Sequence, residues 1–147
     1  MRLKRHLLKH LDDDIGNITV GDTSFKALND FNFSKINDSA VSFANSEKKL
    51  TFNLSQIKND THYLPDLVAK RYDPRAGYTS NQTMNQSNVT MFFLNKEVIG
   101  CYTSECFFRF NHHNYMISGV NMPYNQSEYF TNTCKKVVDS FNNTNNR

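Results

Sequence analysis

Two adjacent histidines, His112 and His113, are the first residues in this chain whose types could do chemistry. An imidazole can act as a general base or bind a metal, and together with Arg109 or a cysteine this pair would suit a hydrolase-type enzyme. A metal site needs a third ligand, and the chain contains no His-x-His or Cys-x-x-Cys spacing. Because the flanking Asn111 and Asn114 tolerate turn geometry, we interpret both histidines as solvated groups at a hairpin tip.

A second pair, His6 and His10, lies four residues apart on a predicted N-terminal helix, so both imidazoles could face one metal ion. Asp13 or Asp14 could supply a third ligand. The zinc-protease form of this spacing has a glutamate directly after the first histidine, and Leu7 occupies that position. Neighbouring positive charges would also repel a cation, so the sequence predicts no metal site here.

The three cysteines are Cys101, Cys106 and Cys134. An odd number favours a reducing compartment over a disulfide framework. A Cys101–Cys106 bridge across a hairpin is the alternative if the protein is exported. No local pattern supplies a base for a cysteine nucleophile, so we expect small, buried, apolar side chains at all three positions.

Other catalytic signatures are absent from the sequence, which has no Gly-x-Ser-x-Gly, no P-loop, no Gly-x-Gly-x-x-Gly and no paired-carboxylate pattern. The net charge of +3 includes no long basic block, which argues against nucleic-acid binding as the main task. We therefore predict no catalytic residue, no cofactor, no metal and no nucleic-acid partner.

Asparagine is frequent, and ten asparagines begin an Asn-x-Ser/Thr triplet, far more than composition alone would give. One interpretation is a glycosylated surface protein. The other is a compositional bias toward small polar residues, which we favour because no export signal is recognised and because Asn53 and Asn88 fall in or beside predicted strands. The ten asparagines are Asn17, Asn32, Asn37, Asn53, Asn59, Asn81, Asn85, Asn88, Asn125 and Asn142.

The 147 residues are expected to form a single domain with a real core. No apolar run approaches the roughly 20 residues of a membrane span. The N-terminus begins like the basic part of a signal peptide, but Lys9, His10 and the aspartates of Asp12–Asp14 interrupt the apolar core, so no cleaved signal is predicted. A cytoplasmic location is expected, with the cell surface or exterior as the alternative.

Helical periodicity predicts an element at each end of the chain. In residues 1–14, an amphipathic helix runs from Arg2 to about Leu11; docking on the sheet is its expected role, and attachment to a membrane surface is the less favoured alternative. A long C-terminal helix runs from Ser127 to about Phe141, followed by a frayed tail, Asn142–Arg147. The apolar stripe of the second helix is Phe130, Cys134, Val137 and Phe141.

Strands are predicted from alternation. A first hairpin covers Asn17–Val20 and Thr23–Leu28, and a further strand covers Ala40–Ala44. Phe31 and Phe33 are core candidates in an irregular stretch. The clearest alternation is Lys49–Ile57, in which the side chains that face the core are Leu50, Phe52 and Leu54.

The densest apolar stretch, Val89–Val120, predicts a central meander of three or four strands. Val89–Leu94 carries apolar groups on both faces, which requires cover on each side. We expect breaks at Asn95-Lys96 and at Thr103–Glu105 and a hairpin turn at residues 111–114. Between the breaks, a strand is predicted at Val98–Thr103, in which Gly100 marks a bulge or a close approach of the backbone.

Between these regions, Leu64, Pro65 and Asp66 begin a short helix that ends before Asp73. The polar stretch Arg75–Ser87 is expected to be a surface loop.

The element order predicts an α+β fold, an antiparallel sheet covered by helices at both ends of the chain. Ile18–Phe33, Val98–Val120 and Ser127–Phe141 make the chain resemble the PsbP-like α/β/α sandwich family, with Gly100 and Tyr102 matching parts of a Gly-x-x-Gly-Tyr motif. The resemblance implies an accessory or binding subunit without catalytic activity.

The sequence therefore favours a non-enzymatic binding module that acts through contacts with another protein. The alternatives are an exported, glycosylated surface or adhesion module and a hydrolase-type enzyme using His112 or His113. Long polar loops on a rigid sheet often carry binding residues, so the expected interaction surface lies in the 75–87 region and at the 111–114 turn. Its candidate residues are Tyr78, Arg75, His112, His113 and Asn114.

Overall fold

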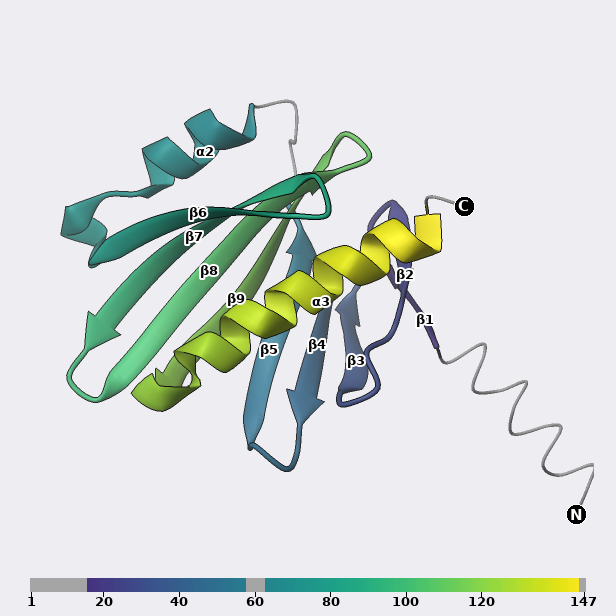
Figure 1. Cartoon of the computed structure of the whole chain (residues 1–147), viewed down its shortest axis with the longest axis horizontal. Coiled ribbons are helices and arrows are strands. Elements are labelled where there is room, and N and C mark those ends of the chain that lie inside the picture. Colours follow the sequence, from purple (N-terminus) through teal and green to yellow (C-terminus); the bar gives the residue numbers. More distant parts are fainter. Residues whose placement is uncertain (1–15, 58–62, 146–147) are drawn as a thin grey trace, which may run out of the picture.

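A computed structural model describes residues 16–57 and 63–145 of the chain. Within these ranges the chain forms a seven-stranded antiparallel sheet, a separate two-stranded hairpin and two α-helices (Figure 1). The predicted N-terminal helix, Arg2–Leu11, and its histidines His6 and His10 lie outside the described residues. No helix among the described residues is long and apolar enough to cross a membrane.

The sheet has the strand order β3-β4-β5-β9-β8-β7-β6, so β3 and β6 are its edges. Every neighbouring pair is antiparallel, as predicted. The strands are β3 (Asn32–Asn37), β4 (Ala40–Asn45), β5 (Leu50–Gln56), β6 (Ser80–Gln86), β7 (Val89–Val98), β8 (Cys101–Phe110) and β9 (His113–Pro123). The separate hairpin consists of β1 (Asn17–Val20) and β2 (Thr23–Lys26).

The helices lie on opposite faces of this sheet. The long helix α3 (Ser127–Asn145) crosses one face diagonally together with the β1–β2 hairpin, and α2 (Leu64–Arg71) lies at the β6–β8 side (Figure 1). Short 3-10 turns, η1 (Pro74–Ala76) and η2 (Tyr124–Gln126), precede β6 and α3. The expectation of a sheet covered by helices is thus too broad, because α2 spans only part of its face and the β3–β5 part of that face has no helix among the described residues.

Alternation along the strands explains the two apolar clusters. In β5, Leu50, Phe52 and Leu54 are buried while Thr51 and Asn53 are exposed, as the sequence predicted. The two-sided burial predicted for β7 is also confirmed. Alternate residues of β7 belong to opposite clusters: Met91 and Phe93 pack beneath α3, and Phe92 and Leu94 pack beneath α2.

The predicted break at Asn95 and Lys96 is wrong, because β7 continues to Val98. Buried Asn95 satisfies its amide within the sheet, accepting from Ser104 Oγ at 2.7 Å and donating to Ser80 Oγ at 3.2 Å. Thr103–Glu105 likewise lies inside β8 and does not interrupt this strand, because Ser104 bonds to Asn95 of the neighbouring strand. The polar residues of the sequence thus predicted turns at positions where neighbouring strands satisfy the hydrogen bonds of those side chains.

The chain instead reverses between β7 and β8 at Ile99 and Gly100. Gly100 has a φ of +76°, a conformation that glycine adopts at little cost, so its role is a turn and not a bulge. The hairpin turn predicted at residues 111–114 is confirmed, and it is tight: Asn111 and His112 occupy it with φ values of +50° and +68°.

The expected surface loop Arg75–Ser87 is also corrected, since Ser80–Gln86 forms the edge strand β6. An edge strand pairs on one side only and here buries little of its surface, so its residues lack the apolar alternation of inner strands. Met84 is the one apolar residue of β6, and it packs against the main core.

Two further expectations are corrected at elements that pack on the main core. Phe33 lies in β3 and not in an irregular stretch. The expected frayed tail is helical as far as Asn145, because side chains of the last turn bond to β2: Thr144 Oγ1 accepts from the Lys26 amide at 3.0 Å, and Asn145 Nδ2 donates to the Ser24 carbonyl at 2.9 Å.

Phe141 of α3 is the centre of the core where helix, hairpin and sheet meet. Its ring stacks on Phe25 of β2 at 4.8 Å between centroids and makes edge contacts with Phe108, Phe110 and Tyr115. The side chain is fully buried. One residue therefore links α3 to the β1–β2 hairpin and to β8 and β9.

We expect Phe141→Ala to lower the free energy of unfolding by about 3–5 kcal/mol, the usual range for removing a buried phenylalanine ring. Urea unfolding followed by circular dichroism measures the change. Asn143→Ala, an exposed substitution on the same helix, is the matched control. A loss from Phe141→Ala no larger than that of the control would contradict the central packing role of this ring.

Candidate functional site

The two histidines that the sequence singled out have different surroundings. His112 is exposed at the β8–β9 turn. His113 lies in β9, partly buried, with Nδ1 3.6 Å from Asp22 Oδ2 and 3.5 Å from Gln56 Nε2. Gln56 also accepts from the Asp22 amide at 2.8 Å and donates to the Asp22 carboxylate at 2.8 Å. His113 therefore belongs to a contact that holds the β1–β2 turn against the sheet.

The other candidate residues of the expected interaction surface do not form one patch. Arg75 is exposed and pairs with Asp73 at 3.2 Å. Tyr78 is buried, and Asn114 is fully buried and accepts from Arg109 Nη1 at 2.9 Å. Neither of these buried side chains is available to a partner. Among the described residues, no cluster of three or more histidine, cysteine, aspartate or glutamate side chains could hold a metal ion.

The structure brings Tyr78 into a charged network that sequence reasoning missed. Glu105 of β8 receives two hydrogen bonds from Arg71 of α2, at 3.1 Å from Nε and 2.7 Å from Nη2. The Tyr78 hydroxyl donates to the same carboxylate at 2.5 Å. The Arg71 guanidinium also lies over the Phe107 ring at 5.6 Å, and Lys96 Nζ lies over the Tyr78 ring at 4.5 Å. These contacts fasten α2 to the sheet.

The network favours an ionised Glu105 carboxylate and a protonated Tyr78 hydroxyl. Burial raises the pKa of Glu105, but hydrogen bonds from Arg71 and Tyr78 and the positive charges of Arg71 and Lys96 outweigh burial, so its pKa lies below the ordinary value. Burial and the bond to Glu105 raise the pKa of Tyr78, which keeps its hydroxyl protonated as a donor. Because Arg71 and Tyr78 both donate to the Glu105 carboxylate, the network holds α2 against the sheet, and we call these three residues the Glu105 clamp.

Replacing Glu105 tests this clamp. Because the folded pKa is depressed, the stabilisation is fully present above the ordinary carboxyl pKa and is lost as the pH falls through the lower folded pKa. We expect Glu105→Gln to cost about 1.5–3 kcal/mol of unfolding free energy at pH 7, the range for hydrogen bonds to a charged group, and to cost less in acid. Urea unfolding measured from pH 7 down to pH 3 checks this.

The control for that series is Glu47→Gln, an exposed carboxylate at the β4–β5 turn. A Glu105→Gln cost that does not change between neutral and acid pH would contradict the clamp.

The cysteines occupy two environments. Cys101 is partly exposed at the start of β8, whereas Cys106 and Cys134 are fully buried. The alternative of a Cys101–Cys106 bridge across a hairpin is ruled out by position, because both residues lie on the same strand. Burial, and then contact with the Cys106 thiol, raises the pKa of Cys134 well above its ordinary value. A thiol that stays protonated is a poor nucleophile.

We expect a disulfide reagent such as Ellman's reagent to modify one thiol per folded chain, Cys101, and three after unfolding. Cys101→Ser should remove the fast reaction while leaving the two thiols that react only in urea. Rapid modification of more than one thiol in the folded protein would show that the β8–α3 interface is accessible.

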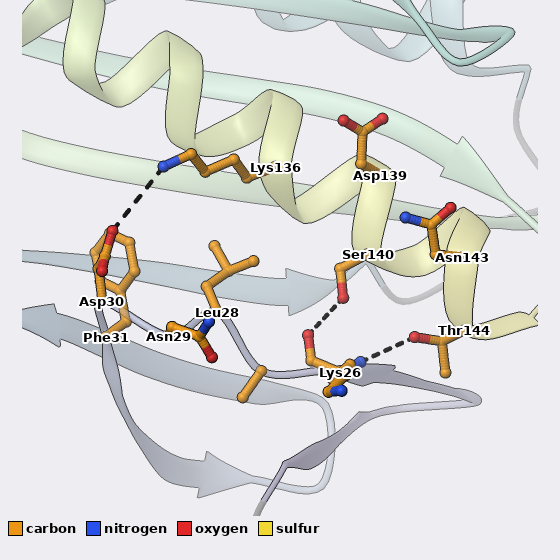
Figure 2. A pocket seen from close by; sticks show the side chains of 11 residues that line it. Lys26, Leu28, Asn29, Asp30, Phe31, Lys136, Asp139, Ser140, Asn143 and Thr144 are labelled. Atoms are coloured by element: carbon orange, nitrogen blue, oxygen red, sulfur yellow. Dashed lines mark hydrogen bonds and ion pairs between the residues drawn. The ribbon is translucent and has the colours of Figure 1, made fainter.

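A polar groove of about 530 Å³ lies between the β2–β3 connection and α3. Figure 2 shows that Lys136 of α3 reaches toward Asp30, with 4.0 Å between Nζ and Oδ2. Ser140 donates to the Lys26 carbonyl, and Thr144 accepts from the Lys26 amide (Figure 2). The groove is lined by Lys26, Ala27, Leu28, Asn29, Asp30, Phe31, Lys136, Asp139, Ser140, Asn143 and Thr144.

The chemistry of this groove is already used for packing. Its two hydroxyls hold the end of β2, and Asp139 accepts from Gln86 at 2.9 Å and from Ser87 at 2.6 Å. The Lys136–Asp30 pair is exposed, and such pairs contribute little. The Ser140 and Thr144 hydroxyls of the lining bond to the backbone of Lys26, so neither is held as a nucleophile beside a base.

A second groove, about 490 Å³, runs along α2 on the opposite face of the sheet. Its floor is apolar, and Lys70 and Arg71 stand at its rim. Arg71 is the residue that binds Glu105, so this groove borders the clamp. Its lining residues are Ser55, Ile57, Leu67, Lys70, Arg71, Phe107 and Met116.

Three of the exposed large apolar side chains of the described residues, including the most exposed one, lie together at the end of the sheet where β7 turns into β8; Ile36, Tyr63 and Val120 are exposed elsewhere. Ile99 is fully exposed at 102%, Val98 is 67% exposed, and Tyr124 of η2 is 59% exposed. These three residues, with Glu97, Gly100 and Cys101, line a shallow hollow of about 310 Å³. We call Val98, Ile99 and Tyr124 the apolar tip; it lies near the first turn of α3, at the lower left of Figure 1.

The apolar tip stands on a rigid base. Val98 pairs with Cys101 in the β7–β8 ladder, and Cys101 in turn pairs with Pro123 of β9. The Tyr124 ring meets the Tyr102 ring edge-on, 6.1 Å between centroids. Sequence reasoning placed Val98 and Ile99 inside a strand; the signal for the tip was Gly100 directly after two β-branched apolar residues.

Comparisons with known proteins do not assign this chain to a family. No protein-family model matches the chain, and no curated protein matches it either.

Proposed function

We propose that this chain is a non-enzymatic binding module that contacts another protein through the apolar tip. The observation that carries the proposal is the full exposure of Ile99 beside exposed Val98 and Tyr124. Burying an isoleucine side chain on association is worth about 1.5–3 kcal/mol, so leaving one fully exposed on a supported turn favours an occupant. Tyrosine adds a large surface with a polar end, which is typical of binding hot spots.

A protein partner fits this tip better than a membrane surface. Glu97 precedes the tip, and its hydrogen bond to Tyr124 raises the pKa of that tyrosine. A carboxylate at this position would be repelled by anionic lipid headgroups, whereas polar and charged groups are normal at the rim of a protein interface.

The non-enzymatic character is supported by what surrounds the chemical groups. His113 contacts Asp22 and Gln56, and the Glu105 carboxylate is occupied by Arg71 and Tyr78. The antiparallel sheet with a long closing helix is also compatible with the resemblance to PsbP-like accessory proteins, at the level of fold.

The interaction surface is accordingly proposed at Val98, Ile99 and Tyr124, in place of the patch expected around residues 75–78 and 112–114. Arg75 and His112 are exposed but lie on different turns.

The test is affinity capture with three full-length baits expressed in the native cells: wild type, Val98→Ser with Ile99→Ser, and the control Ile36→Ser. Ile36 is 55% exposed on β3, at the opposite edge of the sheet. We expect wild type and Ile36→Ser to retain the same protein and the tip variant to bind it about 10- to 100-fold more weakly, given the apolar burial lost.

Binding of the captured protein is then measured with purified components for all three baits. Equal affinities for wild type and the tip variant would contradict the proposal. Equal unfolding midpoints for the three baits exclude misfolding as the cause of a difference.

A further inference from the structure

The Asn-x-Ser/Thr asparagines lie on the outside of the fold. Of the nine that the structure describes, eight are exposed and Asn142 is partly buried. The buried asparagines of the described residues are Asn45, Asn95 and Asn114, and none of these begins such a triplet. Asn53 lies in β5 and Asn88 lies between β6 and β7, as the sequence predicted, but the side chains of both are exposed.

Two triplets have their asparagines on the part of the sheet face beyond α2, and Ser55 of the second lines the groove along α2. Side chains two residues apart on a strand share a face, so Asn32 with Ser34 on β3, and Asn53 with Ser55 on β5, each present amide and hydroxyl on one side. This is the side opposite Phe52, which packs beneath α3. We call this region, built from β3, β4, β5 and β9, the open face.

The cross-strand neighbours of Asn53 and Asn32 on this face are small, uncharged side chains, whereas Met116, farther along β9, belongs to the apolar cluster beneath α2. Asn53 of β5 has Ser42 of β4 as its neighbour on one side and Ser118 of β9 as its neighbour on the other. One row away, Ala44 separates Asn32 from Thr51. The contrast with the α2 side is clear, since Phe92, Leu94 and Phe107 there need apolar cover.

Small neighbours leave room above Asn53 and Asn32. Within the ranges that the structure describes, neither side chain is engaged in a hydrogen bond with the protein, whereas the asparagines buried in the sheet are bonded on both sides or held by a charged neighbour. A face of this kind also lacks the apolar centre that a protein interface normally has.

We propose that the open face carries N-linked glycans at Asn53 and Asn32. The co-reactant is a lipid-pyrophosphate-linked oligosaccharide, delivered by an oligosaccharyltransferase. A bond forms between the amide Nδ2 and the anomeric carbon of the first sugar, and the bond from that carbon to the phosphate oxygen breaks. The amide loses one proton, and the lipid pyrophosphate leaves with the electron pair.

The two attachment points are far enough apart to be occupied together. Asn53 and Asn32 are two strands apart, about 10 Å at the usual strand spacing, and one row apart along the strands, about 7 Å. Each glycan would lie over Ser, Thr and Ala side chains.

Glycans on the open face would protect the exposed edge of the sheet. β3 is an edge strand, and an exposed edge is a template for pairing with another chain. A glycan at Asn32 shields that edge. Because such modification belongs to secreted or surface proteins, the proposal places the chain outside the cytoplasm, the location that the sequence alone ranked second.

The test uses the full chain with a C-terminal affinity tag, purified from its native cells, with intact mass and glycopeptide mapping as the readout. We expect glycan mass on the peptides containing Asn32 and Asn53. Asn53→Gln and Ser55→Ala should each remove one glycan, whereas Ser55→Thr, which keeps the triplet, should retain it. Asn29→Gln changes an exposed asparagine outside any triplet and should leave the glycan mass unchanged.

A native mass equal to that of the bare chain would overturn the proposal. Glycan confined to other asparagines, with the Asn32 and Asn53 peptides bare, would overturn it as well. Both results leave the apolar tip untouched, since its test measures binding with and without Val98 and Ile99.

Discussion

The burial of one stripe of α3 against the sheet is the interaction on which the rest of this structure depends. Phe130, Cys134, Val137, Val138 and Phe141 are all fully buried between the helix and the strands. Phe141 extends the contact to Phe25, and so fixes the β1–β2 hairpin on the same face. Because an apolar sheet face must be buried, the position of this helix determines which face of the sheet carries the main core.

The opposite face of the sheet has an apolar part and a polar part, and only the apolar part needs cover. Where β6–β8 carry large apolar groups, α2 covers them and the Glu105 clamp fastens it. Where β3–β5 carry serine, threonine and asparagine, cover by a helix would gain little free energy, and no helix within residues 16–57 and 63–145 lies on that part of the face. At the apolar tip, three exposed apolar side chains lie together and no described helix covers them, which is why binding is proposed there and glycan attachment on the open face.

Much of the fold follows from local patterns, and the errors share a cause. Leu50, Phe52 and Leu54 alternate, and the stripe from Phe130 to Phe141 is helical in period, so both elements were predicted. Asn95 and Ser104 were interpreted as breaks because their hydrogen bonds are supplied by neighbouring strands that the local sequence does not reveal. The edge strand β6 has little apolar pattern for a related reason, since it packs on one side only.

The candidate site was less predictable, because exposure depends on the whole fold. Tyr78 and Asn114 are polar enough to suggest a surface but are buried, and Ile99 suggests a core residue but is fully exposed.

The most direct measurement is hydroxyl-radical footprinting of the chain in its native assembly and after purification. The account predicts protection of Val98, Ile99 and Tyr124 in the assembly with Ile36 unchanged; equal oxidation of the tip in both states would contradict it.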